Sequence, residues 1–178
     1  MPTTASGIIY PASSANTQLW THFQTMADSI ETPLASLIED RHLDVTRTTT
    51  QSITHNSTSY ISFNSEIADT HGYITVTSDT ITIPTGAGGV YCISAYARYA
   101  ANATGFRVLG IEVAGSVVAE WRGLAHTTGG QPTSMGASIG GIRLAQTNTI
   151  KLLTFQNSGG ALNTEASTPR LHLLRVAA

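Results

Sequence analysis

The second half of the chain alternates apolar and polar residues with a two-residue period. From Tyr60 onward, runs such as 81–83 and 109–113 place an aliphatic side chain at every other position, as expected of strands with one buried face. Turns containing Gly, Asn or Pro separate the runs, and no helical period lies between them. The pattern predicts a mainly β head over residues 58–178, an antiparallel sandwich or barrel of about eight strands.

A helical period precedes this region. The apolar positions that define it are Leu19, Phe23, Met26, Ile30, Leu34 and Leu37. Their spacing predicts an amphipathic helix with a narrow seam, and Thr32-Pro33 marks the start of a second short helix. We therefore expect a helical stalk over residues 15–42. Helices this short are marginal alone in water, so the seam needs a partner: either two further copies in a three-fold bundle, or the chain's own β head.

Two further segments complete the predicted organisation. Residues 1–14 form an irregular arm, because Pro11 prevents a helix from running through it. The arm carries an apolar patch of Ile8, Ile9, Tyr10 and Pro11, which favours an anchor that docks into a neighbouring molecule over a disordered tail. Residues 43–57 are polar and rich in Thr, with no clear core face, and are expected to form an extended neck.

Composition favours an assembly component over a free monomer. Charged residues make up 11% of the chain, against about 25% in soluble domains, while the hydrophobic share of 41% supplies a normal core. The net charge of -2 and the scattered Lys and Arg residues predict no nucleic-acid binding. No run reaches the ~18 apolar residues of a membrane span, so no membrane insertion is expected. The N-terminus lacks the pattern of a secretory signal, so we expect synthesis in a cytoplasm.

Several motifs of the β region, taken in order, resemble the globular head shared by complement C1q and tumour necrosis factor. They are TITIP at 80–84 with GGVYCIS at 88–94, ANATG at 101–105 with IEVAG at 111–115, IRLA at 142–145 with LTFQNSGGALN at 153–163, and LHLLRV at 171–176. Where the family usually has Gly-Asp, this chain has Thr147-Asn148, and Asn also tolerates a left-handed turn. The resemblance covers about two-thirds of the chain and implies a jelly-roll sandwich that assembles as a homotrimer.

The N-terminal segment resembles the opening of phage minor tail and fibre proteins, through GIIYP at 7–11 and the helix over 20–30. Together the resemblances imply a structural protein of a bacteriophage virion. The implied partners are its own copies, other virion proteins bound through the arm, and a host-surface glycan or protein. A trimeric capsid decoration or head-fibre protein is the alternative. A free cytoplasmic binding module, or a secreted host protein of the same fold, is a third interpretation.

Three residues are candidates for host contact: Trp121, Arg122 and His126. An exposed Trp beside an Arg can stack on a sugar, but a Trp at this point can equally be half-buried in a trimer seam. His126 lies in a small polar loop, 125–132, which weakens the case that this loop recognises a host receptor.

No enzymatic chemistry is predicted, and no cofactor or resident metal. Residues 136–140 spell GASIG, yet a nucleophile elbow needs a helix after the Ser, and the following residues continue as a strand. The six His residues show no metal-ligand spacing. Three-fold symmetry could still gather His42 or His55 around a metal; the alternative is that both are solvated neck residues.

Overall fold

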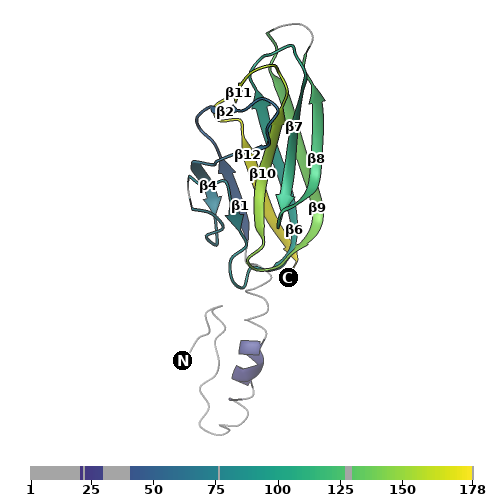
Figure 1. Ribbon diagram of the computed structural model, residues 1–178. Helices are drawn as coiled ribbons and strands as arrows, with labels where there is room; N and C mark the ends of the chain where they lie inside the picture. Colours follow the sequence, from purple (N-terminus) through teal and green to yellow (C-terminus); the bar gives the residue numbers. More distant parts are fainter. Residues whose placement is uncertain (1–20, 22, 30–40, 76, 127–129, 178) are drawn as a thin grey trace. The chain divides into compact units, whose positions relative to one another are not determined.

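A computed structural model describes residues 21, 23–29, 41–75, 77–126 and 130–177 (Figure 1). The chain divides into two compact units, Met1–Asp40 and Arg41–Ala178. In the first unit, residue 21 and residues 23–29 are α-helical. Within this helix the Thr25 hydroxyl donates to the Thr21 carbonyl at 2.9 Å. The helix predicted around Phe23 and Met26 is confirmed at these positions, whereas the arm patch and Leu19, Ile30, Leu34 and Leu37 lie outside the described residues.

The second unit is built from β-strands. In chain order they are β1 (His42–Thr46), β2 (Gln51–Ile53), β3 (Ser59–Tyr60), β4 (Ser65–Asp69), β5 (Ile81–Thr82), β6 (Gly89–Tyr99), β7 (Phe106–Val113), β8 (Ser116–Leu124), β9 (Thr133–Leu144), β10 (Thr149–Gln156), β11 (Leu162–Thr164) and β12 (Arg170–Ala177). Eight of these twelve described strands have five residues or more, which matches the predicted number of about eight.

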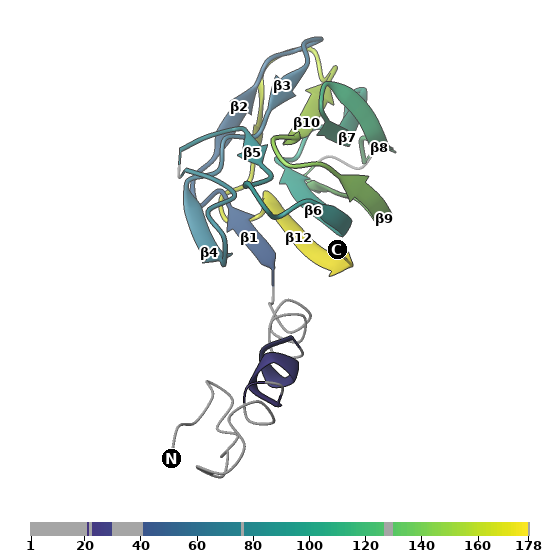
Figure 2. The ribbon, with the colours of Figure 1, turned by 90° about the horizontal axis from the view of Figure 1, so that it is seen from below.

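The strands form two sheets that face each other (Figures 1 and 2). In the larger sheet β6 lies between β9 and β12, and β1 lies between β12 and β4, while the short β11 and β2 continue from the end of β6. In the smaller sheet β10 lies between β7 and the short β3 and β5, and β8 forms the edge. Every described pairing is antiparallel, and the connections β6–β7, β8–β9 and β9–β10 cross between the sheets. The predicted jelly-roll sandwich is confirmed.

Alternating burial along the long strands produces the core. On β6 every second side chain is buried between the sheets, among them Tyr91, Ile93 and Tyr99, and the alternate residues face outward. The Tyr99 hydroxyl donates to the Val108 carbonyl at 2.9 Å and also hydrogen-bonds the Thr154 hydroxyl, which ties the two sheets together. Burial raises the pKa of Tyr99 to about 12, so the phenol is neutral at ordinary pH.

The predicted neck over 43–57 is wrong. Residues 42–46 form β1, which pairs with both β12 and β4, and Leu43, Val45 and Ile53 are all buried in the core. His42, expected at the end of the stalk, is the first residue of β1. The apolar alternation here is short and lies among Thr residues, so it is weak in the sequence. The strands form because β1 finds its partner more than 120 residues away in β12.

Replacing Gly105 by Ala is expected to lower the free energy of unfolding by about 3 kcal/mol. Gly105 has a φ of +73°, and a Cβ there would lie 2.2 Å from Asn157 Oδ1 and 2.3 Å from the Asn157 carbonyl oxygen. The Asn157 oxygen cannot move freely, because it accepts a hydrogen bond from the Phe106 amide at 2.6 Å. Urea denaturation followed by circular dichroism measures the loss.

Gly159→Ala is the matched control for this substitution. Gly159 also has a positive φ, +91°, but no atom lies within 4 Å of the added Cβ, so only the backbone penalty of about 1–2 kcal/mol applies. If both variants lost the same free energy of unfolding, the clash of the added Cβ with Asn157 would contribute nothing to the loss.

Candidate self-association surface

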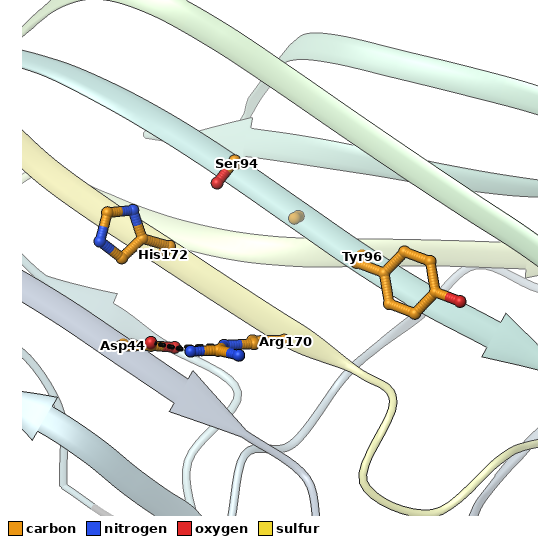
Figure 3. A pocket seen from close by; sticks show the side chains of 6 residues that line it. Asp44, Ser94, Tyr96, Arg170 and His172 are labelled. Carbon is orange, nitrogen blue, oxygen red and sulfur yellow. Dashed lines mark hydrogen bonds and ion pairs between the residues drawn. The ribbon is translucent and has the colours of Figure 1, made fainter.

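The outward side of the larger sheet carries a shallow hollow of about 310 Å³. We call the outward side of β1, β6, β9 and β12 the open face. Figure 3 shows Ser94 and Tyr96 on β6, Arg170 and His172 on β12, and Asp44 on β1, all lining the hollow. The strands' alternation explains the arrangement, because each of these residues sits between neighbours whose side chains enter the core.

An ion pair crosses the open face from β12 to β1. Arg170 Nε donates to Asp44 Oδ1 at 2.7 Å, and Arg170 Nη2 contacts Asp44 Oδ2. The hydrogen bond that Arg170 donates to Asp44 raises the pKa of Arg170 above its ordinary value. The Asp44 side chain is largely buried, whereas that of Arg170 is 53% exposed. A pair this exposed is worth under about 1 kcal/mol, and the Arg170 side chain is accessible to a further partner.

From Ser134 to Gly140, β9 carries only small residues on the open face. The outward residues of this stretch are Ser134, Gly136, Ser138 and Gly140, and all four are exposed, whereas the exposed Arg143 follows near the end of the strand. Tyr96 rises beside them, in register with Gly136, and its hydroxyl donates to Ser134 Oγ at 3.1 Å. Small residues allow the backbone of a second molecule to approach closely, so the open face combines a flat strip with one projecting aromatic ring.

A second feature lies at the margin of the sandwich where β8 and β9 run side by side without pairing (Figures 1 and 2). We call it the β8 edge. Here Trp121 is 59% exposed on the side of β8 that faces the other sheet, and Val117 is 47% and Leu124 79% exposed on the opposite side. The edge strand is nine residues long and contains neither Lys nor Pro. A long edge strand with exposed apolar residues is normally covered in the assembled protein.

Trp121 and Arg122 do not form a joint platform. Trp121 is in register with the core residue Leu109, so it projects from the side of β8 that faces the other sheet. Arg122 is in register with Val108 and projects to the opposite side, where its guanidinium carbon lies 3.4 Å from the centroid of the Phe106 ring. His126 is exposed and follows the end of β8.

The cluster around Phe106 was not predicted from the sequence. The rings of Phe106 and Phe155 stack with centroids 5.6 Å apart, and Arg122 covers Phe106. These residues come from three neighbouring strands of the smaller sheet, so only the strand order brings them together. Neither Ser94, Tyr96 nor His172 gave any signal beyond ordinary strand alternation.

The remaining candidates take structural positions. Ser138 of the GASIG motif lies in the middle of β9, paired with Ser94, so the strand-to-helix turn of a nucleophile elbow is not formed. His42 lies on β1 with its ring centroid 6.5 Å from that of His172. His55 Nδ1 accepts a hydrogen bond from the Gly159 amide. Over the described ranges, no three His, Cys, Asp or Glu side chains are grouped to hold a metal.

The described helical residues are too few and too polar to cross a bilayer. Within the helix, Phe23 is 49% and Met26 53% exposed. Two of the six residues expected to form the stalk seam therefore show large exposed apolar side chains.

Comparison with known proteins identifies the fold. No family model matches the chain, and no curated protein matches its sequence. Among solved structures, Eiger TNF from S. frugiperda aligns over 78% of this chain and 93% of its own, with a TM-score of 0.58 and 10% identity. The globular domain of zebrafish complement 1qA aligns over 76% and 97%, with a TM-score of 0.52 and 14% identity. The β head is thus a jelly roll similar to those of tumour necrosis factor and C1q, as the motifs implied.

The vertex protein P5 of PRD1 aligns over 76% of this chain and 72% of its own, with 17% identity. Its TM-score of 0.49 is too low to support a functional argument.

Proposed function

We propose that the chain is a non-enzymatic structural protein of a bacteriophage virion, a homotrimeric minor tail or fibre protein. It attaches to the particle through Ile8, Ile9, Tyr10 and Pro11 and presents its jelly-roll head to the host surface. The observation that carries the proposal is that one head exposes both a flat open face and an apolar β8 edge.

The two surfaces suit a cyclic assembly. They are different patches of the same chain, so contact between the β8 edge of one copy and the open face of the next is heterologous. Such contacts close into a ring when the rotation between copies allows, and three copies form the smallest ring that is not a pair. Trp121 would then lie against the flat strip around Ser138 and beside Tyr96, in the seam, while Arg122 and His126 would remain outside it.

The helical stalk also exposes apolar side chains that further copies of the chain would cover. Phe23 and Met26 are half exposed on the described helix, and a three-fold bundle would cover them together with Leu19, Ile30, Leu34 and Leu37. Burial of apolar side chains at about 25 cal/mol per Å² would add to the stability of the assembly. The low charged fraction of 11% agrees with a chain that buries much of its surface against its own copies.

Light scattering of the full chain and of residues 41–178 tests the assembly. One chain has a mass of 18.7 kDa, so we expect about 56 kDa for the full chain, three times 18.7 kDa. Residues 41–178 contain their own core, and a trimer of this unit would place assembly in the head. A trimer of the full chain alone would place it in the stalk, and monomers in both samples would contradict the proposal.

The virion location is tested separately. Mass spectrometry of purified particles of the phage that encodes this chain is expected to detect its peptides. Gold-labelled antibody against the head is expected to mark the tail. Label on the shell would instead favour the capsid decoration or head-fibre role, because the same trimer can be seated there through the arm. Absence of the protein from particles would contradict a virion role altogether.

A further inference from the structure

A second hollow, of about 450 Å³, lies at the β3 end of the smaller sheet, away from the β8 edge. We call it the hydroxyl pocket. Its described lining residues are Tyr60, Ser62, Thr75, Thr77, Ser78 and Asp79. Tyr60 belongs to β3, and the last four belong to the segment between β4 and β5. Each of these six side chains ends in a hydroxyl or a carboxylate, which is unusual for a hollow of a size that takes small ligands.

Several polar groups of the pocket remain available to a ligand. Asp79 Oδ1 accepts a hydrogen bond from the Thr80 hydroxyl at 2.7 Å, and its second oxygen has no partner among the described residues. The hydroxyls of Thr75 and Thr77 make no hydrogen bond to any described residue, and both residues are exposed. The pocket therefore presents two hydroxyls, which both donate and accept, beside one carboxylate oxygen, which accepts.

The pocket wall is held in place by the core. The Thr77 amide donates to the Phe63 carbonyl at 2.9 Å, and the Phe63 amide donates to the Ser78 carbonyl at 2.9 Å. Phe63 itself is fully buried. Thr77 has a φ of +77°, a conformation that β-branched residues rarely adopt. The two hydrogen bonds to Phe63 fix this conformation, so a ligand would meet pre-positioned groups and less ordering entropy would be lost on binding.

Charge in and beside the pocket selects against anions. Tyr60 donates its hydroxyl to Glu112 Oε2 at 2.8 Å, and this hydrogen bond is the main reason that the pKa of Tyr60 is raised, with a smaller contribution from Asp79. The phenol is therefore neutral, while two carboxylates lie nearby. Lys151 Nζ lies 4.7 Å from the centroid of the Tyr60 ring and offsets part of this charge. A neutral ligand rich in hydroxyl groups matches these groups best, because it can donate to the carboxylate and exchange hydrogen bonds with the threonines.

We propose that the hydroxyl pocket binds a neutral saccharide of one or two pyranose rings, with Thr75, Thr77 and Asp79 as its polar contacts. The site belongs to a single chain, so it does not depend on trimer formation. It extends the proposed function only in naming a ligand class for contact with a host surface, and it lies apart from Trp121, Arg122 and His126.

Saturation-transfer NMR with the full-length protein tests the site, using glucose, galactose, N-acetylglucosamine and lactose as probes and sialic acid as the anionic comparator. We expect transfer to at least one neutral sugar and none to sialic acid. Asp79→Asn and Thr75→Val are each expected to weaken the affinity about tenfold, which corresponds to 1.4 kcal/mol. Thr85→Val, in the exposed turn after Pro84 and outside the pocket lining, is the matched control.

Three results would overturn the inference. They are no transfer to any neutral sugar at about 10 mM, ten times a Kd of about 1 mM; equal affinity in the wild type and both pocket variants; or a preference for sialic acid. Light scattering on the same samples separates this failure from that of the proposed function, because a trimer that binds no sugar refutes only the pocket. Thermal unfolding of each variant checks that a lost signal does not arise from a lost fold.

Discussion

Replacing Gln156 by Glu is expected to lower the free energy of unfolding by about 4 kcal/mol. The Gln156 side chain is fully buried at the end of β10. Its Nε2 donates to the carbonyls of Ile53 at 2.9 Å and Gly160 at 2.8 Å. Its Oε1 accepts from the amide and hydroxyl of Ser158 at 2.7 Å and 2.6 Å. The amide group thus satisfies four partners and joins β10 to β2 and to the loop that follows β10.

A carboxylate at this position has the same shape but no donor. The Ile53 and Gly160 carbonyls would face a buried negative charge in place of two N–H groups, and both hydrogen bonds from the buried side chain would be lost. Urea denaturation at neutral pH measures the loss. Asn163→Asp makes the same chemical change at an exposed position of β11, and it is expected to change stability by no more than about 0.5 kcal/mol. A loss below about 1 kcal/mol for Gln156→Glu would mean that the four hydrogen bonds do not form as described.

This amide network gives a physical reason for one motif that carried the sequence resemblance. The run 156–160 reads QNSGG, and in the structure Gln156 bonds to Ser158 and Gly160 while the side chain of Asn157 bonds to the Phe106 amide. In the sequence the run resembled a jelly-roll segment, but its partners Phe106 and Ile53 lie some 50 and 100 residues away, respectively. Only the folded sheets bring them within hydrogen-bond distance.

The long strands were predictable because their alternation extends over many residues. On β6 five core residues follow one another at every second position, and such a run has one plausible structure. Strands β1 and β2 were missed because only two or three residues in each carry the signal. Their stability comes from pairing with β12 and β11, and pairing partners are not encoded locally.

The candidate surface also has one part that the sequence could predict and one that it could not. Residues adjacent on a strand point to opposite faces, so strand periodicity alone was sufficient to separate Trp121 from Arg122 once β8 was recognised. Strand periodicity could not predict the hollow on the open face. Ser94, His172 and Asp44 are unremarkable polar residues of three strands, and they form one hollow only because β6, β12 and β1 are neighbours in the sheet.

Placing an arginine on that face is expected to abolish the trimer. Ser138 lies at the centre of the flat strip of β9, exposed and paired with Ser94. In a single chain the substitution Ser138→Arg adds a solvated side chain and is expected to change stability by no more than about 0.5 kcal/mol. In the proposed seam, the same side chain would occupy the space of the neighbouring copy and bring an additional positive charge near Arg170. Overpacking costs about 1–3 kcal/mol at each seam, and burying a charge without a partner adds several kcal/mol.

Three seams in one ring multiply this cost, so sedimentation or light scattering of residues 41–178 is expected to show the variant as a monomer at concentrations where the wild type is a trimer. Thr82→Arg is the matched control, because Thr82 is exposed on the outer side of the smaller sheet, in register with Thr149, and no copy is proposed to lie there. Equal loss of the trimer in both variants would point to non-specific charge repulsion. A trimer retained by Ser138→Arg would exclude the open face from the seam, and the exposed β8 edge would then need a different partner, since an apolar edge strand with Trp121 at its centre is not left uncovered without cost.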